Sequence, residues 1–278
     1  QFIIYIMGAF VSIGLLNGLV DGGWSTIFSE AREAGKFAVF QGGDPVTHQY
    51  HFVTAVMGGM FLSLASHGTD HLMVQRLMAA RNVEAGQRAL IGSGFMAIFQ
   101  FSLFLLVGTG IWVFNKGVDM NSNEVFSTFI IDNLPVGVKG LIVAAIFSAA
   151  MSTLSSSINA LASTTMTDWI KWIAPDRYNL TTSRFLSLIW TVVLAGGATL
   201  FTSTEGSLVE IGLAIASFTY GGLLGFFLLG RMKAEFPASS VIAGFVASIA
   251  AMVVVVRFTA VAWPWYTIIG LSIMVATS

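Results

Sequence analysis

The 278-residue sequence contains no cysteine and very little charge. Without cysteine, the chain can form neither a disulfide nor a thiolate metal site. Charged residues make up 10% of the chain and hydrophobic residues 55%, whereas a soluble domain carries about 25% charged residues. This composition is typical of a polytopic membrane protein, and the 29 glycines fit the close packing of membrane helices. The net charge of −1 is not the basic balance typical of nucleic-acid-binding proteins, so no nucleic-acid partner is expected.

Motifs of catalysis are also missing from the sequence. It contains no GxSxG, HExxH or phosphate-binding loop. His48 and His51 stand three residues apart, but no third ligand adjoins them to complete a metal site. We therefore expect a protein that is not an enzyme.

The two ends of the sequence are apolar. The chain is hydrophobic from Phe2 onward, and no basic region or cleavage site precedes that segment, so it is not read as a signal peptide. The first residue is not methionine, and the last expected span reaches Ser278. The sequence is accordingly interpreted as an internal piece of a longer protein.

Eight apolar segments have roughly the length that crosses a bilayer, about 17–25 residues. They lie near residues 1–20, 52–73, 89–114, 138–166, 184–202, 208–230, 238–256 and 261–278. No linker between soluble domains interrupts them, so we expect one transmembrane domain over residues 1–278. The sequence thus predicts an all-α, multi-pass protein of the cell membrane.

Basic residues divide unequally between the loops of this eight-span arrangement. With the loop after the second span in the cytoplasm, the inner side holds 8 basic residues and the outer side 5. The inner set is Arg76, Arg81, Arg88, Lys171, Arg177, Arg184, Arg231 and Lys233; the outer set is Arg32, Lys36, Lys116, Lys139 and Arg257. Because basic residues favour the cytoplasmic side, both ends of the chain are expected inside.

One long outer loop, residues 21–51, includes an amphipathic stretch. Trp24, Ile27, Phe28 and Ala31 recur at helical spacing, which predicts a short helix at the outer membrane surface.

A run of hydroxyl side chains marks the fourth span, AAMSTLSSSINALASTTMTD at residues 149–168. Because lipid offers no hydrogen bonds, a helix this polar must face protein, water or an ion. Ala149, Ser152 and Thr153 stand at i, i+3 and i+4, on one helix face. Two hydroxyls and a nearby carbonyl suit a small hard cation. The alternative is a small-residue surface for helix packing, and both roles are compatible.

A second signature, GTDHLMVQRLMAARN at residues 68–82, lies at the inner end of the second span. Together with the hydroxyl run, it resembles the sodium/solute symporter family, which includes carriers of sugars, proline, pantothenate, iodide and monocarboxylates. A third stretch, YGGLLGFFLLG at residues 220–230, resembles the tenth core helix of that family. The similarity extends from about Gly22 to Arg231.

The resemblance implies a partial LeuT-like fold, in which two inverted five-helix repeats surround a mid-membrane site. The second inverted repeat would occupy about residues 52–230, with the second span as its broken helix, and accessory helices would occupy about 238–278. The broken helix of the first repeat would precede Gln1. On the same mapping, sodium would bind the Ala149 carbonyl and the Ser152 and Thr153 hydroxyls, and the missing helix would supply the other oxygens.

The resemblance also suggests where a solute would bind. It places substrate contacts near Ser63, Ser66 and His67, while Gln100 and Tyr220 are further candidates for the pocket. Each has a structural alternative: His67 as a hydrogen-bonded structural histidine, and Gln100 and Tyr220 as helix–helix hydrogen bonds.

Three further positions bear on the class of solute and on the helix break. Positions that carry polar groups in the sugar carriers are Ala97 and Leu213 here, which argues against a glucose-type solute. Asp70 is expected to cap a helix or pair with Arg76.

These features favour sodium-coupled symport of a small polar organic solute by alternating access, with sodium, the solute and the lipid membrane as partners. A second hypothesis is a membrane-embedded sensor with a symporter-like domain. A third is a remnant that does not transport.

Overall fold

The computed structural model describes residues 2–118, 121, 123–199, 207–232 and 236–278. Within these ranges the chain is built from helices and has no β-strand beyond one isolated bridge between Gln41 and His51. It divides into two compact units, residues 1–36 with 87–206 and residues 37–86 with 207–278. The division does not test the expectation of one transmembrane domain over residues 1–278, which stays a prediction.

In the described part of the chain, seven helices are long and apolar enough to cross a membrane. They are α1 (Phe2–Leu19), α3 (Phe52–Thr69), α5 (Val83–Phe114), α7 (Val136–Thr164, continuing to Ile173), α9 (Leu180–Ala198), α10 (Leu208–Arg231) and α11 (Ala238–Phe258). Many of their large apolar side chains are exposed, as expected of helices that face lipid. The prediction of a multi-pass membrane protein is confirmed.

The eighth expected span, residues 261–278, contains the 3₁₀ turn Trp263–Trp265 and the helix α12 (Tyr266–Thr277). The twelve residues of α12 are too few to cross a bilayer by themselves, so an eighth crossing stays a prediction. Residues 200–202 of the fifth expected span and Lys233 lie outside the described residues.

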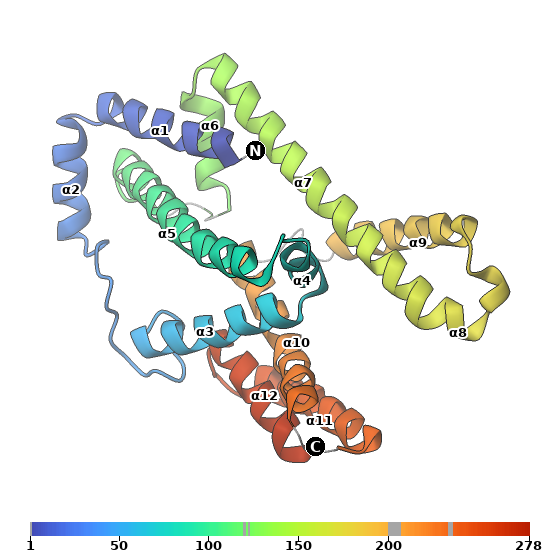
Figure 1. The fold of residues 1–278 in the computed structure, drawn as a ribbon. Coiled ribbons are helices and arrows are strands. Elements are labelled where there is room, and N and C mark those ends of the chain that lie inside the picture. Colours follow the sequence, from blue (N-terminus) through green and yellow to red (C-terminus); the bar gives the residue numbers. More distant parts are fainter. Residues whose placement is uncertain (1, 119–120, 122, 200–206, 233–235) are drawn as a thin grey trace. The chain divides into compact units, whose positions relative to one another are not determined.

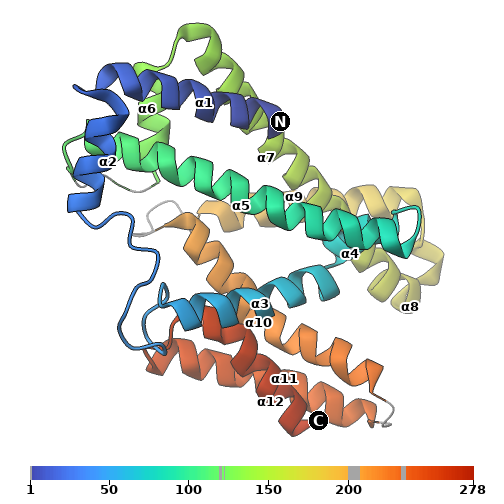
Figure 2. The same cartoon turned by 60° about the vertical axis from the view of Figure 1, so that its left-hand side comes forward.

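The first unit gathers α1, α5, α7 and α9 with the short helices α2 (Gly23–Glu33), α6 (Val125–Asn133) and α8 (Lys171–Ile173). Its apolar core joins residues from α1, α2, α5, α6 and α7. The amphipathic stretch forms α2, as predicted, with Ile27 and Ala31 fully buried. Helix α9 returns alongside α7 (Figures 1 and 2).

A π-helical turn, Thr165–Ile170, follows directly from α7. The Trp190 indole N–H of α9 donates to the Thr165 hydroxyl at 3.0 Å, and that hydroxyl donates to the Leu161 carbonyl at 2.7 Å. This chain of hydrogen bonds fixes the end of α7 against α9, and it gives the Trp190 N–H and the Thr165 hydroxyl a partner each.

The second unit contains α3, α4 (His71–Met78), α10, α11 and α12. Helix α10 packs closely on α12, and α11 packs on both of them (Figure 1). Helix α3 lies against α10, and its Gly58 meets Pro264, where an added Cβ would stand 2.7 Å from the proline carbonyl oxygen. The small residue therefore permits the close approach of α3 to the turn before α12.

The segment before α3 is tied to this unit by hydrogen bonds. The Pro45 carbonyl accepts from the Thr54 hydroxyl and, at 2.8 Å, from the Trp265 indole N–H. The Val46 amide and the Thr47 hydroxyl donate to the Asp44 carboxylate and hold the pKa of that carboxyl below its ordinary value. The carboxylate thus favours an ordered turn ahead of α3 while it is ionised.

Candidate functional site

The second expected span is a broken helix, as the resemblance implied. Helix α3 ends at Thr69, Asp70 is extended (φ −70°, ψ 121°), and α4 starts at His71. One Asp70 carboxylate oxygen accepts from the Leu72 and Met73 amides at 2.9 and 3.2 Å, so Asp70 is the N-cap of α4. Of the two roles expected for Asp70, capping a helix or pairing with Arg76, the structure has the cap.

The other Asp70 carboxylate oxygen accepts a hydrogen bond from Tyr220 of α10. The phenol oxygen lies 2.7 Å from Oδ2, and both side chains are half-buried within the second unit. Charge-assisted hydrogen bonds of this length are among the stronger ones in proteins. The Tyr220 hydroxyl thus makes a helix–helix bond, one of its two predicted roles, and its role toward a solute stays a prediction.

The other substrate candidates on α3 form a local cluster. His67 Nδ1 lies 2.9 Å from the Ser63 carbonyl oxygen and 3.0 Å from the Ser66 hydroxyl. The Ser66 hydroxyl also donates to the Ser63 carbonyl at 3.2 Å. His67 is therefore hydrogen-bonded to its own helix, while Ser63 is exposed.

A cavity of about 450 Å³ borders the break in the second unit. Its walls come from Gly68 and Thr69 at the end of α3, from α4, and from Leu223, Phe226 and Phe227 of α10. Thr69, His71 and Gln75 supply its polar groups, and the α10 wall is apolar. The break thus leaves a mostly apolar space, with its polar groups on the α3 and α4 side.

The three predicted sodium ligands lie in the first unit, on α7. Ser152 and Thr153 are exposed, Ala149 is half-buried, and all three belong to uninterrupted α-helix. Neither hydroxyl has a hydrogen-bond partner among the described residues. By contrast, the Ser156 and Thr165 hydroxyls donate to carbonyls of their own helix, at 2.9 and 2.7 Å. The Ser152 and Thr153 oxygens therefore remain available as ligands.

Gln100, also in the first unit, lies on α5 and is half-buried. Its amide has no hydrogen-bond partner within the described part of the chain, so a pocket role stays a prediction. The clusters of three or more His, Asp or Glu side chains that hold transition metals are absent from the described residues. Sodium does not require such clusters, because carbonyl and hydroxyl oxygens can hold a small hard cation.

Several proteins of known type resemble this chain in sequence. A putative sodium-dependent multivitamin transporter of Drosophila melanogaster is 28% identical over 88% of this chain and 43% of its own length. A sodium/sialic acid symporter of Aliivibrio fischeri is 26% identical over 90% of this chain and 52% of its own length. The chain thus spans about half the length of these relatives.

A solved structure of a Na⁺-coupled sialic acid symporter, in a substrate-bound outward-open state, has the same fold. It matches 99% of this chain and 58% of its own chain, with a TM-score of 0.79 and 23% identity. The prediction of a partial LeuT-like helical fold is thereby confirmed, while the repeat boundaries at residues 52–230 stay a prediction. The sodium:solute symporter family model matches residues 1–201. The chain therefore belongs to the sodium:solute symporter family.

Proposed function

We propose that the complete protein couples the entry of sodium to the uptake of a small polar organic solute by alternating access. Family membership and the sodium-dependent relatives support this proposal. The observation on this chain that carries it is the pair of exposed, unpartnered hydroxyls at Ser152 and Thr153. We also infer that the protein is not an enzyme, since its relatives are transporters.

The sodium ion would bind the Ala149 carbonyl and the Ser152 and Thr153 hydroxyls, with the remaining oxygens from the part of the family fold that precedes this chain. The Ala149 carbonyl accepts one hydrogen bond within α7 and keeps a second lone pair. Three neutral oxygens match a hard monovalent cation. The solute candidates are Ser63, Ser66, His67 and Tyr220 in the second unit and, separately, Gln100 in the first.

Removing both hydroxyls tests the sodium site. Ser152→Ala combined with Thr153→Ala should raise the sodium concentration for half-maximal uptake by the full-length protein about tenfold or more, because each lost ligand weakens coordination by about 1 kcal/mol. The solute KM at saturating sodium should change far less.

Ser163→Ala is the matched control. Ser163 is an exposed hydroxyl of the same helix, but it lies about 15 Å beyond Thr153 along the axis. Its removal should leave sodium activation unchanged. Unaltered sodium activation in the double variant would refute the assignment.

The sensor hypothesis differs in what the protein does with its ligand. A sensor would bind sodium or solute without accumulating the solute across the membrane. The transporter relatives favour symport over sensing.

A further inference from the structure

Tyr5 brings a hydroxyl into the apolar first half of α1, which reads FIIYIMGAF. The hydroxyl donates to the Ala145 carbonyl of α7 at 3.0 Å. Ser12, further along α1, instead donates to the Gly8 carbonyl of its own helix at 2.8 Å. A hydroxyl in a membrane span needs a partner, and Tyr5 takes its partner from a neighbouring helix. The bond therefore ties α1 to α7.

The two helices approach closely at this bond. A Cβ added to Gly8 would lie 2.7 Å from the Ile142 Cδ1 atom, and Ile142 and Ala145 are both 3% exposed. Tyr5 meets Ala145 and Gly8 meets Ile142, so the chain directions of α1 and α7 oppose each other here.

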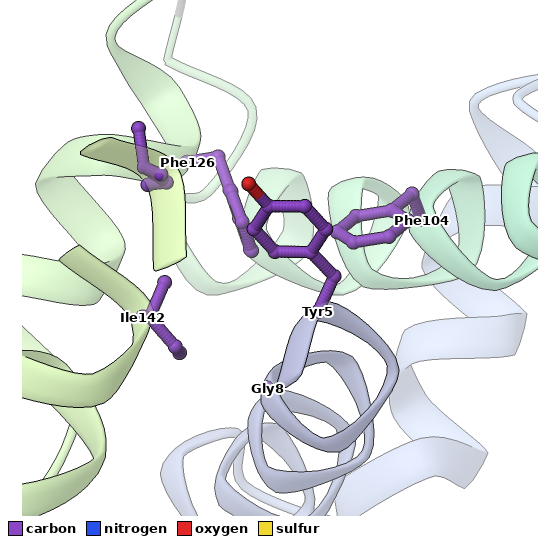
Figure 3. Close-up of a pocket in the computed structure, with 6 residues that line it drawn as sticks. Tyr5, Gly8, Phe104, Phe126 and Ile142 are labelled. Atoms are coloured by element: carbon purple, nitrogen blue, oxygen red, sulfur yellow. The ribbon is translucent and has the colours of Figure 1, made fainter. Parts of the chain in front are cut away.

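Among the described residues, the Tyr5 ring borders a cavity that is lined mainly by apolar side chains. A cavity of about 240 Å³ is lined by Tyr5, Gly8, Phe104, Phe126, Ile142 and Ile146. Figure 3 shows the ring beside Phe104, with its hydroxyl turned away from α1. Phenylalanine at position 5 would keep this packing and lose only the bond to the carbonyl. The Ala145 carbonyl would still accept the Ala149 amide within α7.

Ala145 stands one helical turn before the proposed sodium ligands. Ala149 and Ser152 follow it at i+4 and i+7, on the same face of α7. The Ala149 amide donates to the carbonyl that Tyr5 also contacts, and the Ala149 carbonyl lies about 6 Å further along the axis. Restraining Ala145 thus restrains the turn that presents the first ligand.

We propose that Tyr5 is a positioning residue for the sodium site. Through the Ala145 carbonyl it fixes the rotation and height of α7 against α1, and so sets where Ala149, Ser152 and Thr153 stand. This role rests on the proposed function, because it presumes that those three residues bind sodium. It assigns no ligand atom to Tyr5 itself.

Tyr5→Phe in the full-length protein tests the role. The sodium concentration for half-maximal uptake should rise about 3-fold, the ratio that an average interhelical hydrogen bond in a membrane protein supports. The maximal rate per folded transporter and the solute KM at saturating sodium should stay unchanged. The sodium concentration that half-maximally stabilises the purified protein against heat should rise by the same factor.

Tyr178→Phe is the matched control. Tyr178 is an exposed tyrosine before α9, whose hydroxyl has no partner among the described residues. Loss of the Tyr178 hydroxyl should leave the sodium dependence of uptake and of thermal stabilisation unchanged. If the sodium dependence of uptake and of thermal stabilisation is unchanged in Tyr5→Phe, the positioning role is overturned. This holds whether or not the yield of folded protein falls.

The Ser152→Ala, Thr153→Ala double variant separates the two proposals. If it weakens sodium activation while Tyr5→Phe does not, only the positioning role fails. If the double variant also leaves sodium activation unchanged, the sodium site itself is wrong, and the positioning role falls with it.

Discussion

The Asp70 carboxylate accepts hydrogen bonds from two helices, α4 and α10. Its Oδ1 atom caps α4, and its Oδ2 atom accepts the Tyr220 hydroxyl of α10. The cap could be anticipated from sequence, since aspartate favours the residue before a helix. The bond to Tyr220 could not, because the two residues are 150 positions apart and only the packing of α3 on α10 brings them together.

Tyr220→Phe should therefore lower stability, by about 0.6–2 kcal/mol, the range for interhelical and charge-assisted hydrogen bonds. Thermal unfolding of the purified full-length protein measures this loss. In an Asp70→Ser background, which keeps a capping oxygen but is too short to reach Tyr220, the same change should cost much less. Equal losses in both backgrounds would show that the bond does not contribute.

Sequence pattern located most helices but fewer of their ends. The apolar run of the third expected span begins near residue 89, but helix α5 already begins at Val83, where the Asn82 side chain accepts the Ala85 amide at 2.8 Å. Helix α2 ends at Glu33, and Gly35 then adopts φ 69°, which other residues rarely accept. Ends set by a single cap or glycine are weaker signals than the apolar run between them.

Close helix packing in the second unit depends on Gly221 of α10. A Cβ there would stand 2.6 Å from the Thr267 carbonyl oxygen and 2.8 Å from the Gly270 Cα of α12, both of them backbone atoms that cannot turn aside. Gly221→Ala should separate α10 from α12 and cost about 1–3 kcal/mol.

Gly212→Ala is the control on the same helix, since nothing lies within 4 Å of its added Cβ. It should be neutral or slightly stabilising, because alanine favours helix more than glycine does. Thermal unfolding of the two variants in detergent compares them. Equal melting temperatures would contradict the packing described for α10 and α12.

At the scale of the whole molecule, the candidate residues fall into two units. The proposed sodium ligands and Gln100 belong to the first, while Ser63, Ser66, His67 and Tyr220 belong to the second. The triplet of Ala149, Ser152 and Thr153 can be proposed from sequence because it lies on one helix with local spacing, and its role as a sodium site stays a prediction. A solute pocket draws on distant elements, and a single sequence gives no signal of which side chains meet there.

Coupling to sodium gives the proposed transporter a defined driving force. One positive charge moving across 100 mV releases about 2.3 kcal/mol, which supports roughly 50-fold accumulation of a neutral solute per ion. A sodium concentration gradient adds to this. Accumulation therefore separates symport from sensing, which needs binding alone.

The most direct test is solute uptake into vesicles that contain the full-length protein, with and without an inward sodium gradient. The panel would include sialic acid, sugars, amino acids, monocarboxylates and vitamins. We expect one of these classes to accumulate only when the sodium gradient is present. A folded protein that accumulates none of them under either condition would contradict sodium-coupled symport and favour the sensor or the remnant.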